Sequence, residues 1–114
     1  MIIEPVKWEF FHDQLLAVSA GDDLEEIREE VKAGLAVLWR CESSEKGGFV
    51  VTRIDGDEFV VVLGEGSGAH EFLPHFVQFA RSRKLKIRTH VTRKGMIRVW
   101  KRYGVFLSEY VLRG

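Results

Sequence analysis

The chain has 114 residues, of which 46% are hydrophobic and 30% are charged. This composition is typical of a globular protein with a core and excludes a disordered chain. The length suits one domain and excludes two ordinary cores, so we expect a single domain over residues 1–114. The longest apolar run, residues 59–63, is far shorter than the roughly 18 residues of a membrane span, and no leader precedes Trp8. We therefore expect a cytosolic protein that does not enter a membrane.

The net charge of zero hides a strong division of charge along the chain. Residues 1–80 carry 6 basic and 16 acidic side chains, whereas residues 81–114 carry 11 basic and 1 acidic, so the two parts are about −10 and +10. Such asymmetry is typical of an anion-binding face for a phosphorylated cofactor, for nucleic acid or for an acidic partner. The alternative is that the two parts neutralise each other in the fold, and the sequence favours neither.

Cysteine and histidine argue against metal chemistry. Cys41 is the only cysteine, which excludes an internal disulfide and a thiolate-rich metal site. The histidines lack a close ligand spacing on one helix face, so we expect no metal and place them at the surface or at a rim. The four are His12, His70, His75 and His90.

The first 34 residues predict a short strand and two helices. Residues 1–4 suit a strand that Pro5 ends. A helix follows, and spacings of three and four predict its buried side, with Gly21 as its end. Asp23 and Glu26 have the spacing of a capping box that opens a second helix, which Gly34 ends. The predicted buried residues are Trp8, Phe11, Leu15 and Val18 in the first helix and Leu24, Ile27 and Val31 in the second.

The middle of the chain predicts an antiparallel meander followed by a crossover. Residues 35–41, 49–54 and 58–63 are rich in β-branched and aromatic side chains, and Asp55-Gly56 is a strong hairpin signal. A glycine-containing loop then leads to a helix that we expect to begin near Glu71, with Pro74 in its first turn and Phe72, Phe76 and Phe79 on its buried stripe. Residues 86–91 read as a strand parallel to the one before the helix.

The chain closes with a predicted helix over residues 93–103, ended by Gly104, and one strand over residues 105–112. The whole order is strand, helix, helix, three-strand meander, glycine loop, helix, strand, helix, strand. This order resembles that of the GNAT acyltransferase superfamily, although one terminal strand common there is missing from the prediction. The resemblance implies an α+β, GNAT-like fold with a mixed central sheet and about four helices.

The loop after the third meander strand carries the first local match. In the GNAT pattern Gln/Arg-x-x-Gly-x-Gly/Ala, residues 63–68 match both glycines, at Gly66 and Gly68, with Leu63 in place of Gln or Arg. Small residues at a helix start let backbone amides approach an anion, whereas a plain turn is the alternative and Glu65 would repel phosphate if it faced inward. The resemblance implies acetyl-CoA or another acyl-CoA held by Val61, Leu63, Gly64, Gly66, Ser67, Gly68 and Arg93.

The second match is at the end of the chain. Residues 93–105 align with the GNAT stretch Asn-x-x-Ala-x-x-Leu-Tyr-x-Lys-x-Gly-Phe, but Arg93 replaces the Asn and Trp100 replaces the Tyr that acts as general acid in many members. An indole cannot exchange a proton near neutral pH, so no catalytic residue is assigned. Arg93, Lys94 and Arg98 would offer charge to the phosphates of the cofactor, and Tyr103 reads as a packing residue.

Three functions therefore compete. The first is an N-acyltransferase that moves an acyl group from acyl-CoA to an amine acceptor. The second is a non-catalytic protein of the same fold, resembling small GNAT-like proteins of phages and prophages, which would serve in a virion or bind a host protein. The third, nucleic-acid binding through the basic C-terminal third, is favoured least because Trp100 and Tyr103 fall on a stripe predicted to be buried. The sequence does not indicate an oligomeric state.

Overall fold

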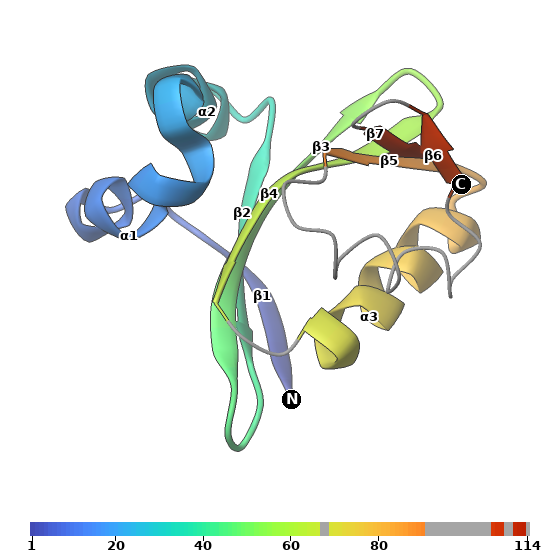
Figure 1. Cartoon of the computed structure of the whole chain (residues 1–114), viewed down its shortest axis with the longest axis horizontal. Coiled ribbons are helices and arrows are strands. Elements are labelled where there is room, and N and C mark those ends of the chain that lie inside the picture. Colours follow the sequence, from blue (N-terminus) through green and yellow to red (C-terminus); the bar gives the residue numbers. More distant parts are fainter. Residues whose placement is uncertain (67–68, 91–105, 109–110, 114) are drawn as a thin grey trace.

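The computed structural model describes residues 1–66, 69–90, 106–108 and 111–113. Figure 1 shows helices on both sides of one curved sheet. The helices are α1 Phe10–Ala20, α2 Leu24–Lys32 and α3 Ala69–Ser82, and a single 3₁₀ turn at Gly21–Asp23 joins the first two. The strands are β1 Ile2–Val6, β2 Val37–Glu42, β3 Gly47–Asp55, β4 Glu58–Gly66, β5 Lys86–His90, β6 Phe106–Ser108 and β7 Val111–Arg113. The predicted helix over residues 93–103 lies outside the described residues.

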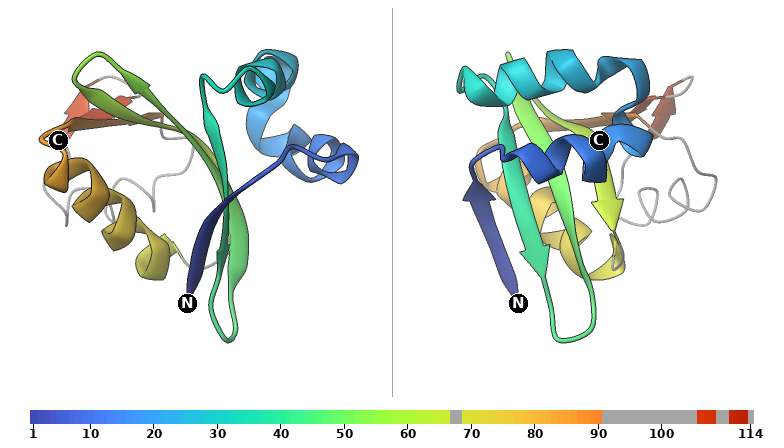
Figure 2. Two further views of the ribbon diagram at one scale, coloured as in Figure 1. Left: turned by 180° about the vertical axis from the view of Figure 1, so that it is seen from behind. Right: turned by 90° about the vertical axis from the view of Figure 1, so that its left-hand side faces the viewer.

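The sheet has the order β1-β2-β3-β4-β5-β7-β6, and every neighbouring pair is antiparallel except β4 and β5. Helices α1 and α2 cover one face and α3 covers the other, as the two views of Figure 2 show. The predicted mixed sheet, the meander and the parallel pair joined through α3 are confirmed. The single strand predicted over residues 105–112 is wrong, because two short strands, β6 and β7, pair there and supply the strand that the prediction lacked.

Each face of the sheet carries its own core. On the α3 side, Trp39 packs edge-on against the ring of Phe76, and its indole Nε1 donates a 2.8 Å hydrogen bond to Thr52 Oγ1. Of the three aromatics predicted on the buried stripe of α3, Phe72 and Phe76 are buried there and Phe79 is partly buried against the same cluster. The buried residues of the α3 side are Cys41, Phe59, Val61, Phe72, Phe76, Val77, Ala80 and Ile87. Those under α1 and α2 are Trp8, Leu16, Ala20, Ile27, Ala36, Leu38, Val51 and Leu63.

The predicted buried side of α1 is wrong. Trp8 is buried as expected, but Phe11, Leu15 and Val18 are exposed, Val18 to 91%. The helix instead buries His12, Leu16 and Ala20. A rotation of about 100°, the angle between consecutive residues of a helix, separates the predicted and observed faces. Apolar side chains lie on both faces of α1, so spacing alone favoured the wrong one.

His12 was predicted at the surface and is almost completely buried. Its Nδ1 accepts a 2.8 Å hydrogen bond from the backbone amide of Glu9, just before the helix begins. Its ring packs edge-on against Phe49, with 4.8 Å between the ring centroids. Because Nδ1 is an acceptor, the proton of the neutral ring is on Nε2, which finds no hydrogen-bond partner among the described residues.

This environment makes the stability of the fold depend on the protonation of His12. Burial lowers the pKa of His12 below its ordinary value of 6.5, although the hydrogen bond to Glu9 and the charges of Glu9 and Asp13 oppose the shift. The unfolded chain therefore binds a proton more readily than the folded one. We expect the free energy of unfolding to be highest above about pH 6.5 and to fall as the pH drops below it. Urea titrations between pH 7.5 and 5.5 measure the slope, which His12→Phe should flatten and the exposed-site change His75→Asn should leave in place.

Three predicted local signals meet different outcomes. The hairpin at Asp55-Gly56 is confirmed, since Gly56 has φ of 59° between β3 and β4. Gly34 has φ of 80° directly after α2, as expected of a helix end. The capping box at Asp23 is wrong: its backbone continues from a 3₁₀ turn with φ −90° and ψ 1°, so its side chain makes no cap bond.

Two predictions about proline are also wrong. Pro5 lies inside β1 and pairs with Trp39, which the sheet tolerates because β1 is an edge strand. Helix α3 begins at Ala69 and not near Glu71, so Pro74 falls inside the helix, beyond its first turn.

Candidate functional site

A β-bulge in β4 is the first unusual feature of the sheet. Val51 pairs with Leu63 and Thr52 pairs with Val61, so Val62 stands between them without a partner of its own on β3. A bulge shifts the alternation of side chains by one residue. Accordingly Val61 is buried on the α3 side, whereas Leu63 is buried under α1 and α2. Bulges of this kind often lie beside functional sites, and nothing in the run of apolar residues indicated this one.

The second feature is the end of the parallel pairing at the same place. The register of β4 with β5 runs from Glu58↔Lys86 to Val61↔Thr89 and stops, while β4 continues to Gly66. Figure 1 shows the two strands diverging above α3. Beyond the bulge, the edge of β4 that faces β5 is therefore not covered by another described strand. An edge with open amides and carbonyls can bind an extended ligand through its backbone.

The glycines at the end of β4 have two different roles. Gly66 has φ of +112°, and a Cβ there would lie 2.3 Å from the carbonyl oxygen of Gly47. Gly66 is therefore required by the close approach of β3 and β4, whatever it binds. Gly64 has no positive φ, and a Cβ there would meet no atom within 4 Å. Of the two, Gly64 is the glycine that leaves space beside the open edge.

The remaining predicted cofactor residues divide into described and undescribed positions. Val61, Leu63, Gly64 and Gly66 follow one another along β4, so the structure does bring them together. Helix α3 begins at Ala69, directly after this segment, and a helix start offers free amides and a positive dipole end to an anion. The predicted residues Ser67, Gly68 and Arg93, together with Trp100 and Tyr103, lie outside the described residues.

Glu65 points away from α3. Its carboxylate accepts a hydrogen bond from the hydroxyl of Ser19 in α1, on the opposite face of the sheet. The repulsion between Glu65 and a phosphate at the start of α3, which the sequence left open, is therefore weakened by this orientation. The same orientation adds a carboxylate to the α1 face of the sheet, which also carries the side chain of the predicted residue Leu63.

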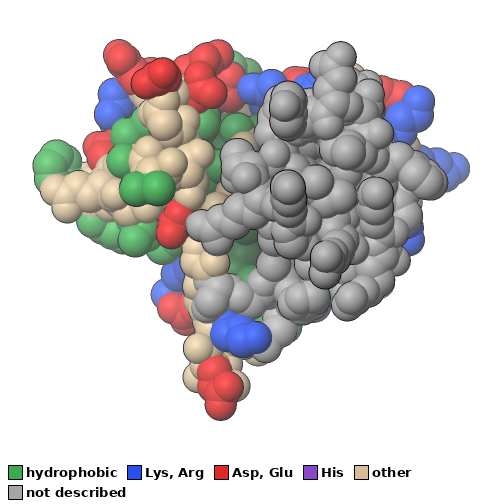
Figure 3. Space-filling model, in the orientation of Figure 1, with side chains coloured by type: hydrophobic (Ala, Val, Ile, Leu, Met, Phe, Trp, Pro, Cys, Tyr) green, Lys and Arg blue, Asp and Glu red, His purple; other side chains and the backbone are tan. Residues whose placement is uncertain are grey.

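The charge division along the chain becomes a partial division in space. Figure 3 shows carboxylates gathered over α2 and the turn before it, and the residues concerned are Asp22, Asp23, Glu25, Glu26, Glu29 and Glu30. Arg88 of the basic part lies 3.0 Å from Asp55 of the acidic part, whereas Arg53 and Glu30, 3.2 Å apart, both belong to the acidic part. Neutralisation between the two parts is thus supported at this contact, and the anion-binding face stays a prediction.

Cysteine and metal chemistry find no support in the described part of the chain. Burial raises the pKa of the Cys41 thiol to about 11, which leaves it protonated and unreactive near neutral pH. No group of three histidine, cysteine or carboxylate side chains within the described ranges could hold a metal ion. Among the described helices, none is both long enough and apolar enough to cross a membrane.

Solved structures show where this arrangement occurs. A Bacillus subtilis acetyltransferase in complex with CoA matches with a TM-score of 0.69 and 9% identity, over 93% of this chain and 76% of that one. Aminoglycoside 6'-acetyltransferase type Ii matches with a TM-score of 0.65 and 13% identity, over 100% and 96%. The PaiA N-acetyltransferase of Thermoplasma acidophilum, in complex with coenzyme A, matches with a TM-score of 0.58 and 11% identity, over 99% of this chain and 97% of that one.

These neighbours are GNAT acetyltransferases, and the present chain has the GNAT fold. The predicted α+β, GNAT-like architecture is thereby confirmed. No protein-family model matches the sequence, and no curated protein matches it either. At these identities the likeness concerns the fold, so the activity has to be argued from the residues of this chain.

Proposed function

We propose that this protein binds an acyl-CoA along the open edge of β4 and transfers its acyl group to an amine. The observation that carries the proposal is the coincidence of three features on one strand: the bulge at Val62, the end of pairing with β5 at Val61, and the approach to the start of α3 beyond Gly66. The fold is shared with two structures that contain CoA, which supports the same ligand here.

The residues fit such a ligand in chemical terms. The backbone of residues 62–66 offers donors and acceptors for the amide-containing arm of a CoA, and Gly64 leaves room beside it. The loop before Ala69 and the first turn of α3 would hold the pyrophosphate, with Arg93, Lys94 and Arg98 proposed as additional cations. Acyl-CoA would supply an activated thioester, whose C–S bond would break as the neutral amine forms a C–N bond. CoA would leave as a thiolate, and the proton lost by the amine nitrogen would convert it to the thiol.

Direct transfer of this kind depends mainly on positioning. The chain has Trp100 where many GNAT enzymes have an acidic Tyr, and we assign no general acid or base. An amide of β4 near the bulge would be the natural donor to the carbonyl oxygen of the acyl group, because Val62 is the residue that the β3 register leaves unmatched. The effect of the missing Tyr would be on the rate and not on the binding of acyl-CoA.

Thermal unfolding with and without acetyl-CoA tests the binding. At about 100 times its dissociation constant a ligand of the folded state adds roughly 2.7 kcal/mol, which raises Tm by on the order of 10 °C for a chain of this size. A graded series, Gly64→Ala, Gly64→Val and Gly64→Leu, should lose this shift as the side chain grows. The Tm of each variant without ligand is the control for folding, because the site has open space around it.

The outcomes separate the candidate functions. A shift in the parent that disappears at Gly64→Leu, with transfer to an amine, supports the acyltransferase. A shift without any transfer would instead support a non-catalytic GNAT-fold protein that binds acyl-CoA. For such a protein we propose a role in a phage particle or in binding a host protein. The absence of a shift in the parent would contradict acyl-CoA binding and the proposal with it.

A further inference from the structure

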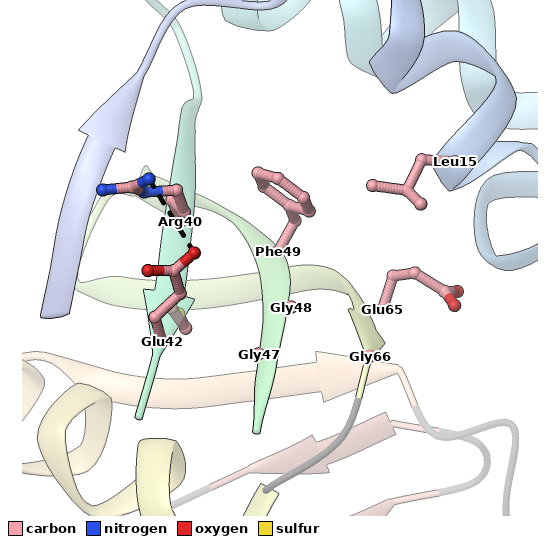
Figure 4. A pocket seen from close by; sticks show the side chains of 9 residues that line it. Leu15, Arg40, Glu42, Gly47, Gly48, Phe49, Glu65 and Gly66 are labelled. Carbon is pink, nitrogen blue, oxygen red and sulfur yellow. Dashed lines mark ion pairs between the residues drawn. The ribbon is translucent and has the colours of Figure 1, made fainter. Parts of the chain in front are cut away.

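A pocket of about 310 Å³ lies beside α1, over the ends of β2, β3 and β4. Figure 4 shows Leu15 of α1 facing Phe49 and Glu65 across it. It lies on the face of the sheet that α1 covers, because Glu65 bonds to Ser19 of α1 and Phe49 packs with the core under α1 and α2. The pocket is lined by Leu15, Arg40, Cys41, Glu42, Gly47, Gly48, Phe49, Glu65 and Gly66.

The described lining of this pocket carries more acidic than basic charge. Among the described lining residues the basic side chain is Arg40, which forms an ion pair with Glu42 at 3.8 Å and a second with Glu4 of β1, so its charge is balanced within the protein. Glu65 is only partly exposed and bonds to the neutral hydroxyl of Ser19. No described basic side chain forms an ion pair with Glu65. A half-buried carboxylate of this kind forms strong, charge-assisted hydrogen bonds with an ammonium group.

The pocket also has an apolar lining. Leu15, which is 43% exposed, lies across the pocket from Phe49 and Glu65, so an apolar side chain stands on each side of it. Phe11 of the same helix is 54% exposed, with its ring centroid 6.5 Å from that of Phe49. Phe11 and Leu15 belong to the stripe that the sequence predicts as core. A ligand with an apolar arm would remove part of this surface from water, which is favourable.

From these features we infer that the pocket binds an organic ammonium compound with an apolar arm. The ammonium group lies against Glu65, and the arm lies between Leu15 and Phe49. This site goes beyond the proposed function, because Glu65 comes three residues after the bulge at Val62 and faces α1, away from the strand edge proposed for acyl-CoA. One strand would thus present its backbone to an anionic cofactor and a carboxylate to a cationic ligand.

Binding of 2-phenylethylamine without any acyl-CoA, measured by calorimetry at pH 7.5, tests the inference. The amine is an ammonium ion at this pH, and 2-phenylethanol is its neutral counterpart of similar shape. We expect the amine to bind at least about tenfold more tightly than the alcohol, and Glu65→Gln to weaken the amine about tenfold through loss of the charged hydrogen bond. Glu45→Gln, the same charge change at an exposed loop site outside the pocket, should leave the affinity unchanged.

Leu15→Asn is a second test. Leu15 is exposed, so its replacement should leave the fold intact. The affinity for both the amine and the alcohol should fall several-fold. The inference is overturned if the parent binds no amine, if amine and alcohol bind equally, or if Glu65→Gln binds the amine as the parent does. Because acyl-CoA is left out, a failure here differs from a failure of the acetyl-CoA shift. Acetyl-CoA binding with no effect of Glu65 would leave the proposed function in place and remove only this ammonium site.

Discussion

Gly66→Ala is expected to lower the free energy of unfolding by about 3 kcal/mol or more, the range of severe backbone effects. Gly66 has φ of +112°, and its new Cβ would lie 2.3 Å from the carbonyl oxygen of Gly47 and 2.5 Å from the Cα of Gly48. Both atoms belong to the backbone of β3, so the clash can be relieved only if β3 and β4 move apart. Urea denaturation followed by circular dichroism measures the loss.

Gly64→Ala is the matched control for this prediction. It makes the same chemical change two residues earlier in β4, where the Cβ meets nothing within 4 Å and φ is not positive. Its effect should stay within about 0.5 kcal/mol, as for most substitutions away from special features. If Gly66→Ala unfolded at the same urea concentration as Gly64→Ala, the close approach of β3 and β4 would be wrong.

The two glycines also decide how the cofactor site can be tested. A substitution at Gly66 would abolish acyl-CoA binding by disturbing β3 and β4, even if the residue never touched the ligand. Loss of binding at that position therefore carries no information about the site. Gly64 gives the cleaner test, because its variants keep the fold and change only the space beside the strand edge.

Local signals predicted much of the fold. The hairpin at Asp55-Gly56, the helix end at Gly34 and the meander depend on residues close in sequence, and each was found where predicted. The short strands β6 and β7 were read as one strand because residues 105–112 contain no strong turn signal. β6 and β7 pair with each other over neighbouring residues, and β7 also pairs with β5, which is a contact between distant segments.

The candidate site was predicted only in outline. The glycine loop directs attention to β4, on which the proposed site lies, but the bulge at Val62 depends on the register between β3 and β4, which no pattern within residues 59–63 expresses. In an unbroken apolar run each side chain could face either side of the sheet, so the sequence does not show on which face Val61 and Leu63 lie. The orientation of Glu65 follows from that same register and was equally hidden.

The bulge connects the two proposed binding surfaces. Because it sets the phase of every later residue in β4, it turns the side chain of Glu65 toward α1 and away from α3. Without the extra residue, Glu65 would face the start of α3 and would repel a phosphate there. A single inserted position thus separates an acidic pocket from an anion-binding edge on one strand.

Leu16→Ala is expected to destabilise the protein by about 2–5 kcal/mol, because Leu16 is fully buried on the core side of α1 and its truncation leaves a cavity. Val18→Ala, on the same helix but 91% exposed, should change the free energy of unfolding by no more than about 0.5 kcal/mol. Urea denaturation at 25 °C measures both.

The comparison decides between the two possible faces of α1. The spacing of Phe11, Leu15 and Val18 predicted the opposite order, with Val18 costly and Leu16 neutral, so the two orientations give opposite results in one experiment. The observed face also matters for the ammonium-binding pocket, since Leu15 can line it only if the stripe to which it belongs is turned away from the core. A larger loss of unfolding free energy for Val18→Ala than for Leu16→Ala would mean that the predicted face of α1 is the buried one. Leu15 would then face the core and could not line the pocket.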